Sequence, residues 1–141
     1  MTGKEYFIHV RNVREAKESL AKHVDELRAM AEAIGGFDYA KPNIQSTPGN
    51  VTENRIIKLV DVLKKYEDVT IEWANLSLEA ESRISHLSRT EYADVIRYRY
   101  LDAKRHSWGW IAEEMGYSGQ RTRSIHGEAL EEFERKYLSV L

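Results

Sequence analysis

Residues 107–126 have the sequence Ser-Trp-Gly-Trp-Ile-Ala-Glu-Glu-Met-Gly-Tyr-Ser-Gly-Gln-Arg-Thr-Arg-Ser-Ile-His, and this stretch decides how the chain is organised. Ser107 is a residue type that accepts hydrogen bonds from the free N–H groups of a helix start. An apolar face follows at helical spacing, made by Trp108, Ile111, Ala112 and Met115. Gly116 suits the left-handed residue that ends a helix, and Ser118 is placed to cap the next one. The stretch therefore predicts two short helices joined by a sharp turn, the pattern of a helix-turn-helix.

The second of these helices carries basic and polar side chains and no acidic residue before Glu128. In a helix-turn-helix the second helix enters the major groove of DNA. Arginine suits guanine or phosphate there, and glutamine suits adenine. The candidate DNA contacts, including two phosphate contacts from the basic linker at 102–106, are Lys104, Arg105, Ser118, Gly119, Gln120, Arg121, Arg123 and Ser124. The alternative for these residues is an ordinary solvated surface with a capping serine.

A second group of residues near the turn is expected to form core and to make no contact with DNA. Its members are Trp108, Ile111, Ala112, Ile125 and Leu130.

The composition limits the classes of function. The 141 residues have a net charge of −2, so a DNA-binding surface must be a local patch and not the whole molecule. The absence of cysteine excludes disulfides, thiolate metal sites and a cysteine nucleophile. No run of about 18 apolar residues occurs, and the N-terminus lacks the apolar core of a signal peptide. We therefore expect no membrane contact and a cytoplasmic location.

Two long amphipathic segments precede the motif. Residues 10–34 have apolar positions at alternating spacings of three and four, as in a coiled coil, and end at a Gly-Gly pair. Residues 37–52 contain both prolines and predict a loop. Residues 53–87 contain no Pro or Gly and continue an apolar stripe that includes Ile56 and Val60. Since neither helix can bury its stripe alone, we expect an antiparallel hairpin.

The fold class that these patterns predict is all-α. The hairpin would occupy residues 1–87, with a role in interaction or dimerisation, and a homodimer is expected. A third helix is predicted from Glu91 to about Leu101. It would belong with the helix-turn-helix to a DNA-binding domain at 88–141.

Residues 83–101 and 108–118, together with the pair Ala129-Leu130, resemble region 4 of the bacterial σ70 factors. The arrangement of a helical N-terminal half, a Ser-Thr-Pro loop and His126-Gly127-x-Ala129-Leu130 is similar to that of small phage-encoded regulators of the ArpU and RinA kind, over most of the chain. This resemblance implies a σ region 4 fold, sequence-specific binding to double-stranded DNA and control of late genes in a phage or prophage. It also implies RNA polymerase as a candidate partner. The chain departs from the pattern at Thr122, where an aliphatic residue is usual, and at Trp110, which we expect to pack on the long helices.

Neither an enzyme nor a cofactor site is expected. The five histidines have no metal-ligand spacing with carboxylates, and no phosphate-binding glycine loop or nucleophile motif occurs. Two other functions remain open: a small terminase-like DNA-packaging subunit, which would form a ring, and a helical module for protein interaction. A mass in solution that corresponds to a ring would identify the packaging subunit, and a failure to bind DNA would favour the interaction module.

Overall fold

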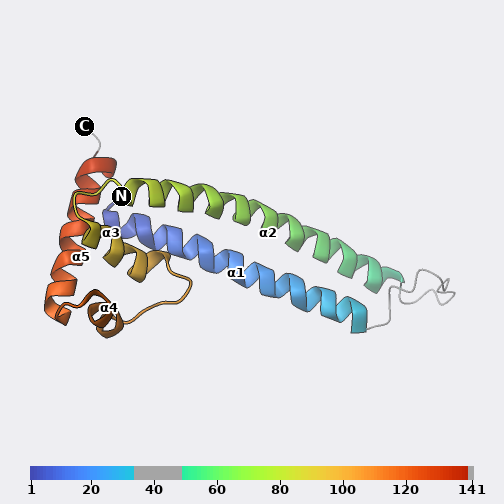
Figure 1. Cartoon of the computed structure of the whole chain (residues 1–141). Coiled ribbons are helices and arrows are strands. Elements are labelled where there is room, and N and C mark those ends of the chain that lie inside the picture. The colour runs from blue at the N-terminus through green and yellow to red at the C-terminus, as the bar shows by residue number, and fades with distance from the viewer. Residues whose placement is uncertain (34–48, 140–141) are drawn as a thin grey trace. The chain divides into compact units, whose positions relative to one another are not determined.

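The structure is a computed structural model that describes residues 1–33 and 49–139. The described residues form no strands and five α-helices, namely α1 (Gly3–Ala33), α2 (Gly49–Ile84), α3 (Thr90–Ile96), α4 (Trp108–Met115) and α5 (Gly119–Phe133) (Figure 1). Two π-helical turns, η1 (Arg97–Leu101) and η2 (Glu134–Leu138), continue α3 and α5. The predicted all-α class is confirmed.

The first helix begins earlier than the sequence suggested. The Thr2 hydroxyl accepts a hydrogen bond from the Glu5 N–H at 3.1 Å, and the Glu5 carboxylate accepts one from the Thr2 N–H at 3.2 Å. This reciprocal capping box satisfies two N–H groups at the helix start, so α1 starts at Gly3 and not near residue 10. The predicted start was therefore wrong.

The second helix also has different ends from those predicted. It runs from Gly49 to Ile84, so residues 49–52 are helical and not part of a loop. Residues 37–48 of the predicted loop lie outside the described residues.

By its contacts the chain divides into two compact units. Unit 1 consists of residues 1–14 and 73–141, and unit 2 consists of residues 15–72. This division does not coincide with the boundary after residue 87 that the sequence suggested. Whether 1–87 and 88–141 act as separate domains stays a prediction.

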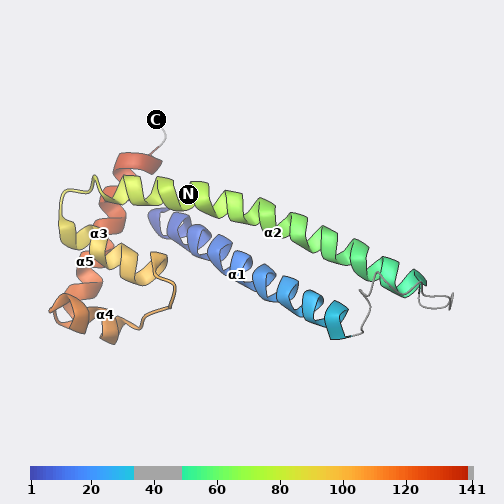
Figure 2. The same ribbon diagram turned by 45° about the vertical axis from the view of Figure 1, so that its right-hand side comes forward.

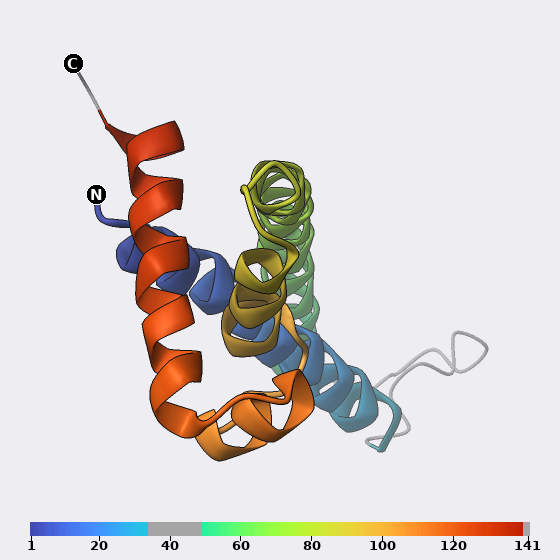
Figure 3. The same ribbon diagram turned by 60° about the vertical axis from the view of Figure 1, so that its left-hand side comes forward.

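An aromatic cluster holds unit 1 together. The ring centroid of Phe7 in α1 lies 4.5 Å from that of Phe133 in α5 and 5.6 Å from that of Tyr100 in η1. Phe7 and Phe133 are fully buried. Figure 3 shows α5 running from the turn beside α4, past α3, to the start of α1. Elements from both ends of the sequence therefore share one core.

The crossing of α1 and α5 is close enough to require a glycine. A Cβ added to Gly3 would lie 2.9 Å from the carbonyl oxygen of Leu130, a distance that real Cβ atoms do not tolerate. The Gly3 N–H also donates to the Glu134 carboxylate at 3.4 Å. Gly3 thus lets the start of α1 pack directly on the backbone of α5.

Unit 2 is a hairpin in which the remaining parts of α1 and α2 run side by side in opposite directions, as predicted (Figure 2). Val24 and Val62 are its buried apolar residues among those described. Ile56 and Val60, predicted to lie in the seam, are 40% and 56% exposed, so that part of the prediction was wrong. The physical reason is that a different stripe of α2, through Val62, packs on α1. No helix in the described part of the chain has the length and apolar character needed to cross a membrane.

Candidate nucleic-acid interface

The turn between α4 and α5 is fixed by capping at three positions. The Ser107 hydroxyl accepts from the Trp110 N–H at 3.2 Å and starts α4. Gly116 ends α4 in the left-handed conformation, with φ 75° and ψ 25°. The Ser118 hydroxyl then accepts from the Arg121 N–H at 3.1 Å and starts α5. All three capping roles predicted from the sequence are confirmed.

The two helices pack through residues that were predicted to form core. Ile111 and Ile125 are fully buried, and Ala112 is buried as well. Trp108 and Leu130 are half-buried and pack against the same core. The predicted separation of core and surface near the turn is therefore confirmed.

Thr122 occupies a buried position in the first turns of α5. Its side chain is fully buried, and its hydroxyl donates to the Ser118 carbonyl oxygen at 2.8 Å. A buried hydroxyl is tolerated where it has a hydrogen-bond partner. The departure from an aliphatic residue is thus accommodated by a bond within the helix.

The ring of Trp110 packs on two other aromatic rings. Its ring stacks on His106 with a centroid distance of 3.6 Å and an interplanar angle of 10°. It also meets the ring of Tyr98 edge-on at 5.5 Å. The first turn of α4 thus directs this ring toward the linker that precedes α4 and toward η1. Packing of Trp110 on the long helices stays a prediction.

The outward side of α5 carries an unbroken polar stripe. Because each residue turns an α-helix by about 100°, Gln120, Arg123, Ser124 and Gly127 share one side of α5. All four are exposed, and a Cβ at Gly127 would meet nothing within 4 Å. Among the described residues, Arg123 has no hydrogen bond or ion pair. We refer to these four residues as the outer stripe of α5.

Arg121 lies on a different side of α5 and is already engaged. Its guanidinium contacts the Glu128 carboxylate at 3.4 Å and the Ser124 hydroxyl at 3.5 Å. The other Glu128 oxygen accepts from the Tyr92 hydroxyl of α3 at 3.0 Å. Sequence analysis missed Glu128 as part of the site, although its spacing of seven residues from Arg121 placed both on one side of the helix.

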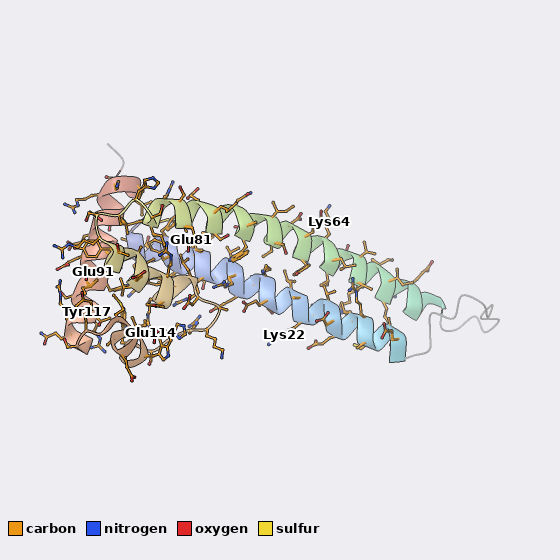
Figure 4. The ribbon with its side chains drawn as sticks, in the orientation of Figure 1. Lys22, Lys64, Glu81, Glu91, Glu114 and Tyr117 are labelled. Atoms are coloured by element: carbon orange, nitrogen blue, oxygen red, sulfur yellow. The ribbon has the colours of Figure 1, made fainter. Side chains whose placement is uncertain are left out.

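An acidic groove of about 620 Å³ lies between α3 and α4. Its lining includes Glu91, Asp94 and Glu114, and Figure 4 shows Glu91, Glu114 and Tyr117 on neighbouring elements. The Tyr117 hydroxyl donates to Glu91 at 2.5 Å and holds the pKa of that carboxyl below its usual value. Arg89 also lines the groove and pairs with Glu91 at 3.3 Å, so three carboxylates face one arginine, and this excess of negative charge disfavours a phosphate there.

The remaining predicted contacts are exposed and come from two segments of the chain. Ser118 and Gly119 lie at the N-terminus of α5, where backbone N–H groups favour an anion. Lys104 and Arg105 are exposed in the linker at 102–106, and the whole of α4 separates them from α5 in the sequence.

A partly buried polar pair joins η1 to α5. The Tyr100 hydroxyl and His126 Nε2 share a hydrogen bond of 2.7 Å, and the Trp108 ring meets the imidazole edge-on at 4.8 Å. Burial, with smaller contributions from the charges of Arg99 and Lys4, lowers the pKa of His126 to about 4. His126 is therefore neutral near pH 7 and adds no positive charge to α5.

No group of three or more His, Asp or Glu side chains within the described ranges is arranged to hold a metal ion. Comparison with known proteins finds no matching family model, no matching curated protein and no matching solved structure. The proposals below therefore depend on the residues of this chain and their geometry.

Proposed function

We propose that the chain binds double-stranded DNA in a sequence-specific way by inserting the outer stripe of α5 into the major groove. The proposal treats α4 and α5 as a helix-turn-helix, in which the second helix is the one that contacts bases. In this role Arg123 and Gln120 contact base edges. The N-terminus of α5, with Ser118 and Gly119, contacts the phosphate backbone.

The observation that carries the proposal is the contrast between the two sides of α5. Gln120, Arg123 and Ser124 are exposed on the outer stripe, while the opposite side, through Ile125, is buried in the core. The first carboxylate along α5, Glu128, pairs with Arg121 and accepts a hydrogen bond from Tyr92, and the next acidic residue on the side of the outer stripe is Glu131, eight residues after Arg123. Gln120 and Arg123 thus lie at the N-terminal end of α5, ahead of the acidic residues of that helix, where they can approach base edges.

Arg121 has a secondary role in this proposal. In the ion pair of Arg121 with Glu128, 42% of each side chain is accessible to solvent, and ion pairs open to solvent contribute little to stability. A DNA phosphate can therefore replace Glu128 as the partner of Arg121. Lys104 and Arg105 would contact phosphates outside the main site.

The biological role proposed here is transcriptional regulation in a phage or prophage. It is supported by the resemblance of residues 83–101 and 108–118 to region 4 of the σ70 factors, which contacts promoter DNA as part of RNA polymerase. A DNA site recovered for this chain, placed upstream of a reporter gene in a bacterial cell, should change expression when the chain is supplied. No change in expression would contradict this part of the proposal.

DNA binding itself is tested by selection from a pool of random-sequence DNA duplexes, followed by measurement of affinity for the recovered sequence. Arg123→Ala should lower the affinity for that sequence by about 1–3 kcal/mol and relax the preference at one base pair. Arg121→Ala together with Arg123→Ala should abolish specific binding while the helix content stays unchanged. The affinity of the original protein should fall steeply with salt, because bound phosphates release counterions.

Arg135→Ala is the matched control, because Arg135 is an exposed arginine at the far end of the same helix, in η2. It should leave the affinity unchanged. A pool that yields no common sequence, or equal losses for Arg123→Ala and Arg135→Ala, would overturn the proposal.

A further inference from the structure

The hairpin of unit 2 exposes a second apolar stripe on α2. Ile57, Val60 and Ile71 are 58%, 56% and 54% exposed. Lys64 and Glu67 lie between them, and the five positions alternate in spacings of three and four residues. This is the spacing that lets one helix pack along another. We refer to these five residues as the Ile57–Ile71 stripe.

The Ile57–Ile71 stripe is separate from the surface that holds the hairpin together. On the side of α2 that packs on α1, Val62 is buried and Leu59 and Tyr66 are half-buried. In Figure 4, Lys64 points away from α1. Helical geometry places the stripe roughly 130° around α2 from the buried side. Helix α1 of the same chain therefore cannot cover it.

We propose that the Ile57–Ile71 stripe binds the same stripe of a second copy of the chain, with the two α2 helices antiparallel. The charges of the stripe select the alignment in which Lys64 of each copy lies opposite Glu67 of the other. Val60 of each copy then lies opposite Ile71 of the other, and Ile57 packs beyond them. Two ion pairs at the centre are thus flanked by two apolar layers.

The alternative alignments are disfavoured by the same side chains. A parallel pair of α2 helices would set Lys64 against Lys64 and Glu67 against Glu67, because equivalent positions face each other in parallel coiled coils. Shifting one helix of the antiparallel pair by seven residues would place Lys64 opposite Val60 and Glu67 opposite Ile57 of the other copy. Both charges would then lack a partner of opposite sign. In the described part of the chain neither Lys64 nor Glu67 forms an ion pair, so both can pair with a second copy of the chain.

The interface is expected to be reversible. Three apolar residues from each copy cover much less than the roughly 800 Å² per partner of a standard stable interface. We therefore expect a monomer–dimer equilibrium that shifts with protein concentration. This inference does not depend on DNA binding, because none of the five residues belongs to the candidate nucleic-acid interface.

The test uses charge reversal at the centre of the stripe and sedimentation equilibrium of the full chain without DNA. Lys64→Glu alone places Glu opposite Glu, and Glu67→Lys alone places Lys opposite Lys. Each variant should weaken dimerisation by about tenfold or more, because like charges across an interface oppose association. When the two variants are mixed in equal amounts, every central pair regains opposite charges. A mixed dimer should then form with the affinity of the original protein.

Lys65→Glu is the matched control, because Lys65 is a neighbouring exposed lysine of α2 outside the stripe. This variant should dimerise like the original protein, and circular dichroism should show the same helix content for all variants. An original protein that stays monomeric as its concentration is raised would overturn the proposal. Single variants that still dimerise, or that fail to associate when mixed, would overturn the antiparallel alignment and with it the proposal.

Discussion

Unit 1 and unit 2 contain parts of the same two long helices, yet they bury their apolar residues very differently. In unit 1, Phe7, Ile84, Ile96, Ile111, Ile125 and Phe133 are fully buried. In unit 2, the buried apolar side chains among the described residues are Val24 and Val62, and Ile57, Val60 and Ile71 stay more than half exposed. Amphipathic periodicity is therefore not enough to bury a helix face.

The difference follows from the number of elements that surround each helix. In unit 1 the ends of α1 and α2 pack with α3, α4 and α5, so several faces of each helix are covered. In unit 2 two helices face each other alone, and each can bury one stripe. Stability should therefore be concentrated in unit 1, and surface left for association should be concentrated in unit 2.

The largest effect is expected from Phe7→Ala in the aromatic cluster of unit 1. Phe7 is fully buried between Tyr6, Tyr100 and Phe133, and removal of such a ring costs about 3–5 kcal/mol of unfolding free energy. Denaturant unfolding followed by tryptophan fluorescence measures this loss, since Trp73, Trp108 and Trp110 all lie in unit 1. A loss below about 1 kcal/mol would contradict the concentration of stability in unit 1, because single surface changes have effects of that size.

Mild acid should weaken unit 1 through His126. Its pKa is about 4 in the folded chain and near 6.5 when unfolded, so the unfolded chain binds more protons between these values. The stability linked to His126 is fully present above pH 6.5 and is lost as the pH falls toward 4. The loss is at most about 3 kcal/mol. His126→Gln should flatten the dependence of unfolding free energy on pH in this range, and an unchanged slope would exclude His126 as its source.

Replacing a glycine inside a helix by alanine usually stabilises the helix, but Gly3→Ala should destabilise the fold. The added Cβ would meet the Leu130 carbonyl oxygen at 2.9 Å, and relieving that clash should cost about 1–3 kcal/mol. Gly127→Ala is the control, because nothing lies within 4 Å of its Cβ position and it should stabilise α5 by about 0.5–1 kcal/mol. Thermal unfolding of both variants measures the contrast. Two changes of the same sign would show that the close crossing of α1 and α5 does not hold.

The smallest effect should come from Val62→Ala in unit 2. Val62 is buried, but only one helix covers it, so we expect a loss below about 1 kcal/mol. Val95→Ala in unit 1 removes the same atoms from a fully buried site and should cost about 1.5 kcal/mol or more. Equal losses in denaturant unfolding of the two variants would remove the distinction between the units.

Several features of the fold and of the site were predictable because they depend on neighbouring residues. Ser107, Gly116 and Ser118 cap helices through contacts within three or four residues, so their roles could be predicted from the sequence. The start of α1 was equally local, but the reciprocal pair of Thr2 and Glu5 was overlooked. Arg123 was correctly placed on the surface.

Other features could not be predicted because they join residues far apart in the sequence. The hydrogen bond from Tyr92 to Glu128 fixes the carboxylate that engages Arg121, and it requires α3 and α5 to be side by side. From the sequence alone, Arg121 and Arg123 were both predicted as DNA contacts, although in the structure only Arg123 of these two lies on the outer stripe.

The sequence by itself determined that the chain forms helices, where a turn separates α4 from α5, and which residues of these two helices are core. These features follow from backbone capping and helical spacing, which act over a few residues. Only the tertiary structure decided which stripe of α2 is buried. Helix α2 carries two apolar stripes of similar spacing, and the choice between them depends on the helix that packs against it.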